Sequence, residues 1–128
     1  MSATILLVDD ERPNVEGGRR LLEHLGCNVF TASNGREAVE VFQEHREQID
    51  LVMLDLVMPE MSGQRCLEKL LQIDPEVAVV IVSGYILDKE TRRRLEPLVA
   101  GFLGKPITAE RLRNAIREAL SKDRAPER

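Results

Sequence analysis

The sequence ILLVDD at residues 5–10 joins four apolar residues directly to two carboxylates. Three later stretches also run from apolar residues into a polar side chain: LVMLD at 51–55, VVIVS at 79–83 and FLGK at 102–105. Short, continuous runs of Val, Ile and Leu are typical of strands covered on both faces of a parallel sheet. With NVFTA at 28–32 as a further candidate strand, these runs predict a parallel sheet whose polar residues gather at one edge.

Segments of helical periodicity separate the predicted strands. Gly26 is expected to end the first helix, Asn34 and Glu37 form a capping box for the second, and Asp88 caps a helix that Pro97 shortens. Strand and helix thus alternate five times. This alternation predicts an α/β, flavodoxin-like doubly wound fold, a five-stranded parallel sheet of order 2-1-3-4-5 with five helices on its two faces.

Size and composition limit the class of protein. The 128 residues suffice for one core, and we expect a domain over residues 1–121 followed by a polar tail or linker start at 122–128. The net charge of −4 argues against direct nucleic-acid binding. No apolar stretch approaches the roughly 18 residues of a membrane span and no export signal is present, so the cytoplasm is the expected compartment. Cys27 and Cys66 are then expected to be reduced, buried thiols.

The polar residues at the strand ends have the chemistry of a phosphoryl site. Asp9, Asp10, Asp55, Ser83 and Lys105 should converge beyond the carboxyl ends of the strands, where open parallel sheets bind ligands. Close carboxylates repel one another, and an oxygen-only ligand set with room for water favours Mg²⁺. An Asp carboxylate can then attack phosphorus, while an ammonium and a hydroxyl bind the phosphoryl oxygens.

Four blocks of the sequence resemble, in order, the signature motifs of the response-regulator receiver domain: LVDDE at 7–11, MLDLVMP at 53–59, VSG at 82–84 and FLGKP at 102–106. The resemblance covers about residues 4 to 121. The sequences SGY at 83–85 and GFLGKP at 101–106 are also similar to those of receivers attached to hybrid sensor histidine kinases.

The resemblance implies a role for each site residue. These are Asp55 as phosphoacceptor; Asp9, Asp10, Asp55 and the backbone carbonyl of Val57 as Mg²⁺ ligands; Lys105 and Ser83 as partners of the phosphoryl oxygens; and Ser83 with Phe102 as the switch pair. Phe102 lacks the hydroxyl of the commoner Tyr, so its ring is expected to lie mostly inward. Val57 and Tyr85 would flank the path of the hydrolytic water and give a slow loss of phosphate.

The implied function is a phosphorylation-dependent signalling switch that takes a phosphoryl group from the phosphohistidine of a histidine kinase, or of a histidine phosphotransfer protein, onto Asp55. It would catalyse only its own phosphorylation and dephosphorylation, and so would not be a metabolic enzyme. The output domain or partner is expected to lie outside this chain. The resemblance is also compatible with a homodimer formed through the last helices.

Three alternatives remain. A phosphatase with an Asp nucleophile would need a second Asp where Val57 stands, and an interaction module that works without phosphate would not need the complete set of site residues. A flavin-binding protein would place an anionic phosphate against the acidic edge.

Several residues have weaker interpretations. The run Arg92-Arg93-Arg94 is interpreted as a solvated helix face rather than a nucleic-acid patch. His24 and His45 are expected on exposed helix faces, with no partner arrangement that suggests phosphotransfer. Gly17 and Gly18 conflict with the first helix, at about 1 kcal/mol each relative to Ala, unless close packing on the sheet requires them.

Overall fold

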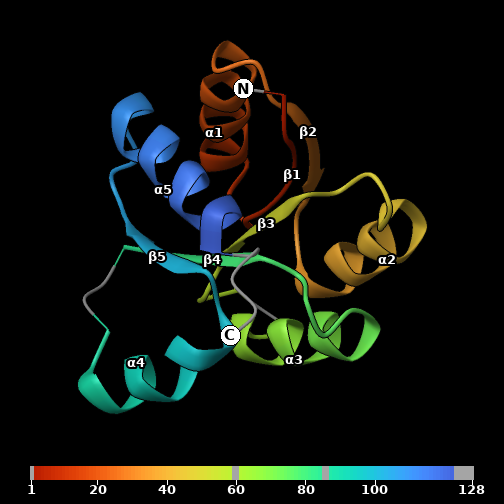
Figure 1. Ribbon diagram of the computed structural model, residues 1–128, viewed down its shortest axis with the longest axis vertical. Coiled ribbons are helices and arrows are strands. Elements are labelled where there is room, and N and C mark those ends of the chain that lie inside the picture. The colour runs from red at the N-terminus through yellow and green to blue at the C-terminus, as the bar shows by residue number, and fades with distance from the viewer. Residues whose placement is uncertain (1, 59–60, 85–86, 123–128) are drawn as a thin grey trace.

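The computed structural model describes residues 2–58, 61–84 and 87–122 (Figure 1). Its strands and helices alternate along the chain, as the sequence predicts. They are β1 (Thr4–Val8), α1 (Arg12–His24), β2 (Asn28–Ala32), α2 (Gly35–His45), β3 (Leu51–Asp55), α3 (Gly63–Ile73), β4 (Val79–Ser83), α4 (Lys89–Leu95), the 3₁₀ turn η1 (Glu96–Leu98), β5 (Gly101–Gly104) and α5 (Ala109–Lys122). None of these helices is long and apolar enough to cross a membrane.

The five strands form one parallel sheet in the order β2-β1-β3-β4-β5, which confirms the predicted topology. Strands β1 and β3 are neighbours, with Val8 opposite Leu54, and β4 pairs with β5 so that Ser83 lies opposite Gly104. The chain therefore reverses its direction of travel across the sheet between β1 and β3. Ligands bind at such a reversal in open parallel sheets.

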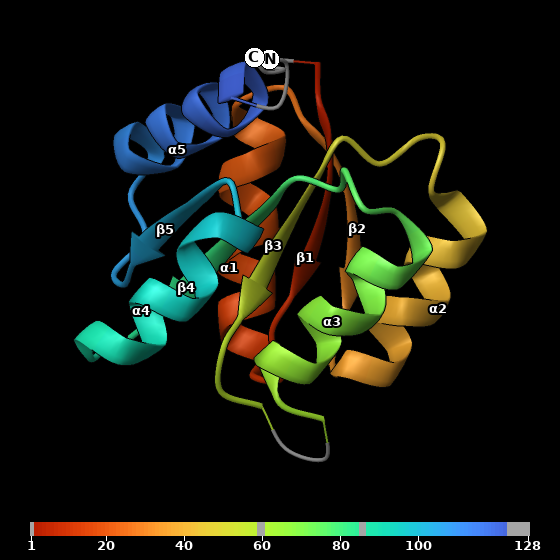
Figure 2. The same ribbon diagram turned by 60° about the horizontal axis from the view of Figure 1, so that its bottom comes forward.

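Helices cover both faces of the sheet (Figure 2). One apolar layer contains Leu6, Val8 and Leu54 and packs against α2, α3 and Leu95 of α4; the other contains Ile5, Leu7 and Met53 and packs against α1 and α5. Successive strand residues thus enter opposite layers, which explains why the strand sequences are apolar throughout. Each fully buried aliphatic side chain contributes about 1.5–3 kcal/mol. Both cysteines are buried free thiols, as expected.

Helix ends follow the predicted signals, with one difference. Gly26, at φ 93°, follows the end of α1, and the Asn34 side chain accepts the Glu37 N–H at 2.8 Å. The Glu37 carboxylate turns to Ser33, whose N–H and hydroxyl donate to it at 2.7 and 2.8 Å. The predicted reciprocal bond back to Asn34 is therefore replaced by a bond one residue earlier, since the chain enters α2 with Asn34 almost fully extended.

Helix α4 is short and buries little of its surface. The Asp88 carboxylate accepts the Thr91 N–H at 2.8 Å, and the helix gives way to a 3₁₀ turn containing Pro97, as predicted. Leu95 is its only buried residue. Its position therefore depends largely on contacts made by long side chains at the surface.

The two glycines inside α1 have different explanations. A Cβ at Gly18 would lie 3.0 Å from a methyl group of Leu7, so close packing of α1 on β1 favours Gly there. A Cβ at Gly17 would meet nothing within 4 Å. Packing on the sheet therefore accounts for Gly18 but not for Gly17.

Candidate functional site

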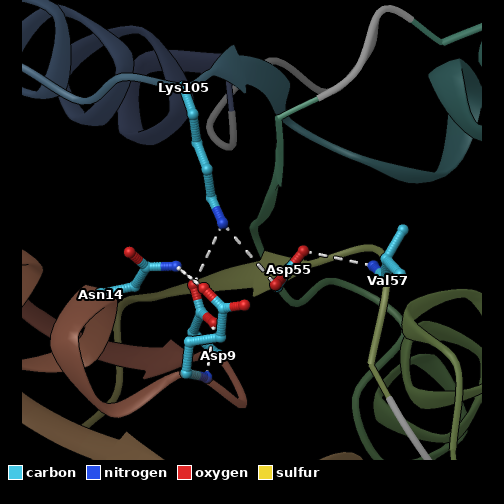
Figure 3. A network of polar contacts seen from close by, with 6 residues as sticks. Asp9, Asn14, Asp55, Val57 and Lys105 are labelled. Atoms are coloured by element: carbon cyan, nitrogen blue, oxygen red, sulfur yellow. Dashed lines mark hydrogen bonds and ion pairs between the residues drawn. The ribbon is translucent and has the colours of Figure 1, made fainter.

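The polar residues predicted to converge lie at one edge of the sheet. Asp9 directly follows β1, Asp55 and Ser83 are the last residues of β3 and β4, and Lys105 directly follows β5. Parallel strands end at the same edge, so residues far apart in sequence become neighbours. Figure 3 shows the side chains of Asp9, Asp55 and Lys105 pointing toward one another from these separate elements.

Three carboxylates form the acidic part of the site. Oxygen atoms of Asp9, Asp10 and Asp55 all lie within 4.8 Å of one another. Asp9 and Asp55 are buried, and Asp10 is more exposed. Two unit charges 4 Å apart repel by about 4 kcal/mol at an effective dielectric constant of 20. The group therefore needs a cation, and its all-oxygen ligand set suits a hard divalent ion.

Backbone N–H groups fix the orientation of the two buried carboxylates. The Glu11 N–H donates to Oδ1 of Asp9 at 3.0 Å, and the Val57 N–H donates to Oδ1 of Asp55 at 3.2 Å (Figure 3). Each bond reaches back two residues and turns the chain sharply away from its strand. The remaining oxygens face the centre of the site.

Gly63 supports the turn that follows Asp55, a contact that the sequence did not reveal. The Gly63 N–H donates to the Leu56 carbonyl at 2.9 Å. A Cβ at Gly63 would lie 2.6 Å from the Asp55 carbonyl oxygen and from the Leu56 Cα atom, both in the backbone. Only glycine allows α3 to begin this close to the site.

Lys105 supplies the positive charge of the site. Its Nζ lies 3.3 Å from Oδ2 of Asp9 and 3.8 Å from Oδ2 of Asp55. Its backbone N–H donates to the Ser83 carbonyl at 2.9 Å, which ties the loop after β5 to the end of β4. The ammonium thus partly neutralises both buried carboxylates.

The net environment favours protonation of Asp55. Burial raises the pKa of Asp55 to about 6; the Val57 N–H lowers it, the charge of Asp9 raises it, Lys105 lowers it and Asp10 raises it. Burial outweighs the hydrogen bond and the ammonium because it removes the carboxylate from water. A bound cation would offset the lost solvation and lower this pKa, which favours the charged, nucleophilic carboxylate.

A hollow of about 370 Å³ opens beside these carboxylates. It is lined by Asp10, Glu11, Asp55, Val57, Gly84 and Lys105. The Val57 side chain is 59% exposed at its rim, and Ser83 is buried at the end of β4. The structure thus brings together the predicted carboxylates and Lys105, and the Lys105 backbone is hydrogen-bonded to Ser83. Tyr85 lies outside the described residues.

Phe102 lies on the same face of the sheet as Ser83, since it pairs with Ile81 and Ser83 is two residues further along β4. The ring is half-buried, and the guanidinium of Arg92 lies 4.3 Å from its centroid. The ring packs against the apolar layer that contains Leu6 and Leu54, and its mostly inward orientation stays a prediction. Since β5 is an edge strand, the ring also contacts a cation of α4.

Two other interpretations also change. Arg92 and Arg94 are exposed but not merely solvated, because Arg94 donates to the Gln64 side chain at 3.0 Å while Arg92 stacks on Phe102. His45 is half-buried and stacks on Phe30, with ring centroids 4.3 Å apart. Such contacts depend on the tertiary fold and leave no local signal in the sequence.

Comparisons with known proteins identify the class. The family model of the response regulator receiver domain matches residues 5–117, and the chain belongs to this family. It is therefore a receiver domain of two-component signalling. It is 39% identical over 121 residues to the sensor kinase CckA of Brucella abortus, covering 94% of this chain and 13% of that protein, which confirms the predicted likeness to receivers of sensor kinases. The chain thus spans only a small part of that relative.

Comparison with solved structures gives the same family and fold. A response regulator receiver domain protein from Clostridium thermocellum superposes with a TM-score of 0.86 at 34% identity, covering 94% of this chain and 95% of that one. The CheX–CheY–BeF₃–Mg²⁺ complex from Borrelia burgdorferi gives a TM-score of 0.83 at 28% identity, covering 89% and 86% of the two chains. The predicted fold and family are thereby confirmed.

Proposed function

We propose that Asp55 accepts a phosphoryl group from a phosphohistidine and that the resulting acyl phosphate switches the signalling state of this receiver domain. The observation that carries this proposal is the position of Asp55. It is buried at the end of β3, close to the other two carboxylates and to the Lys105 ammonium, and it borders the hollow.

The proposed transfer is an in-line displacement. Oδ2 of Asp55, the oxygen nearer Lys105, forms a bond to phosphorus, and the bond from phosphorus to the histidine nitrogen breaks with its electron pair going to the imidazole. Lys105 and the Ser83 hydroxyl bind phosphoryl oxygens in the product, while the Val57 N–H keeps the attacking carboxylate oriented. Positioning and charge neutralisation supply most of the catalysis in phosphoryl transfer.

The ligand set fits Mg²⁺. We propose that Asp9, Asp10, Asp55 and the backbone carbonyl of Val57 hold the ion, with water completing its shell. Bound there, Mg²⁺ would neutralise the carboxylates and the phosphoryl oxygens. The Borrelia complex, which is similar in fold, contains both Mg²⁺ and BeF₃, and this supports the assignment.

We further propose that the donor is a histidine kinase or a histidine phosphotransfer protein in the cytoplasm, and that residues 1–121 act as the receiver unit. The chain would catalyse only its own phosphorylation and dephosphorylation. We also propose that it acts on an output partner and that it pairs with a second copy of itself through the last helices.

An apolar crevice beside the site offers the donor protein a place to dock. This crevice, of about 710 Å³, is lined by residues of α1 and of the loop after β5, among them Pro13, Gly17, Leu21 and Ile107, and Lys105 is also part of its lining. Ile107→Ala should therefore slow transfer from a phosphohistidine protein and leave transfer from acetyl phosphate unchanged.

The central experiment measures labelling by a small donor. The protein is incubated with acetyl phosphate and Mg²⁺, and the intact mass is followed; one phosphate should be added. Asp55→Asn should abolish the adduct, whereas Asp74→Asn, in the turn between α3 and β4 at the opposite edge of the sheet, should not. Labelling of Asp55→Asn at the parent rate would refute the phosphoacceptor assignment. A parent protein that takes no label would instead favour an interaction module.

A further inference from the structure

Arg111 reaches back from the first turn of α5 to the loop that carries Lys105. Its Nη1 donates to the Pro106 carbonyl at 2.8 Å. Its Nη2 lies 3.6 Å from the position that a Cβ on Gly104 would occupy. The guanidinium therefore lies against both neighbours of Lys105 in the chain.

The same short segment is held from its other side by β4, because the Lys105 N–H donates to the Ser83 carbonyl at 2.9 Å. Lys105 itself has a long, flexible side chain, and its ammonium must remain near two carboxylates on other elements. A backbone fixed from both sides limits the positions that this ammonium can reach. Of these two hydrogen bonds, the one from Arg111 comes from outside the sheet.

We propose that Arg111 is a positioning residue for phosphoryl transfer, bracing the Gly104–Pro106 segment so that the Lys105 ammonium stays at the carboxylates. This inference rests on the proposed role of Asp55 and Lys105. Arg111 does not touch the reacting atoms; it acts through Lys105. A planar guanidinium suits the task because it presents several donors in a fixed geometry.

A double-mutant cycle tests whether Arg111 acts through Lys105. Phosphorylation rates with acetyl phosphate and saturating Mg²⁺ are measured for the parent, Arg111→Ala, Lys105→Ala and the double variant. Arg111→Ala should slow labelling about three- to tenfold, the value of one hydrogen bond. In the Lys105→Ala background the same change should have no further effect. Arg111→Lys, which keeps one donor, should recover part of the rate.

Arg113 offers a matched control. It is exposed on the same helix, and its side chain has no hydrogen bond or ion pair within the described part of the chain, so Arg113→Ala should label at the parent rate. Melting temperatures show whether each variant is folded at the assay temperature. If Arg111→Ala is not folded, Arg111→Gln, which retains an amide donor, takes its place in the cycle.

Two results would overturn the inference: an unchanged rate in folded Arg111→Ala, or equal slowing with and without the Lys105 side chain. The proposed function fails differently, through an unlabelled parent or a labelled Asp55→Asn. The two failures are thus distinguishable.

Discussion

The Nζ atom of Lys105 lies 3.8 Å from Oδ2 of Asp55, although the two residues are 50 positions apart in the sequence. The contact exists because β3 and β5 flank β4 and end at the same edge of the sheet. It places a fixed positive charge where a phosphoryl group on Asp55 would carry its negative oxygens. The metal-free site thus already holds part of the charge that the product requires.

Mg²⁺ should stabilise the folded protein because the unfolded chain lacks the converged carboxylates. At 100 times the dissociation constant, binding adds about 2.7 kcal/mol to the free energy of unfolding. Asp10→Asn should lose most of this effect and should raise the melting temperature of the metal-free protein by relieving repulsion. Glu16→Gln, an exposed change on α1, is the control. Melting curves of parent and Asp10→Asn that respond alike to millimolar Mg²⁺ would show that Asp10 is not a ligand.

The raised pKa of Asp55 predicts how stability depends on pH without metal. A carboxyl whose pKa is raised from 3.8 to about 6 on folding favours the folded state most below pH 4 and loses that contribution as pH rises through 6. The loss is roughly 3 kcal/mol at most. Denaturant unfolding in EDTA between pH 4 and 7 measures it, and Asp55→Asn should remove this part of the profile. A parent and variant with parallel profiles would contradict the burial argument.

The same substitution should have opposite effects at two glycines. Gly63→Ala should destabilise the protein by about 1–3 kcal/mol and weaken Mg²⁺ binding, since the new Cβ would press on the backbone of Asp55 and Leu56. Gly17→Ala should stabilise it by about 0.5–1 kcal/mol because the added methyl meets no atom and alanine favours the helix. Equilibrium unfolding gives both values. A Gly63→Ala protein as stable as the parent, with unchanged Mg²⁺ affinity, would rule out this close contact.

The switch prediction couples Ser83 to Phe102 across β4 and β5. When the Ser83 hydroxyl moves to a phosphoryl oxygen, the ring should shift and weaken its contact with Arg92. Fluorine NMR of fluorophenylalanine-labelled protein has only three signals to resolve. Beryllofluoride should move the Phe102 signal more than those of Phe30 and Phe42. Arg92→Ala, but not Arg93→Ala, should shift the Phe102 signal before activation, since a surface cation–π contact is worth about 0.5–1 kcal/mol. An unmoved Phe102 signal would argue against the coupling.

Phosphate should be lost slowly, because Val57 has no side-chain hydrogen bond with which to orient water. Its position at the rim of the hollow and its 59% exposure agree with a place on the water path. Val57→Asn should accelerate hydrolysis about ten- to hundredfold. Intact mass is followed after the donor is removed. Equal decay in both proteins would exclude this position from control of the water.

Much of the fold and of the site could be predicted because the signals lie in short, local stretches of sequence. The strands end where apolar runs meet Asp9, Asp55, Ser83 and the Gly104–Lys105 pair, and the parallel order then brings these ends together. The Asn34 cap was equally clear, since its partner lies three residues away.

What the sequence could not predict depends on the paths of loops and on the reach of long side chains. The clash at Gly63 exists only because the turn after Asp55 passes over the start of α3. Likewise, Arg92 contacts Phe102 and Arg111 contacts Pro106 only when α4 and α5 are packed in their places beside the sheet. The direction in which the Arg92 and Arg111 side chains extend cannot be predicted from residue type or spacing.

Chemical trapping of the phosphorylated residue tests the central claim most directly. After labelling with acetyl phosphate and Mg²⁺, borohydride reduces an aspartyl phosphate to homoserine, and peptide mass spectrometry locates the change. Homoserine is expected at position 55 and at no other aspartate. Reduction at Asp9 or Asp10, or a phosphate retained on another type of side chain, would contradict it.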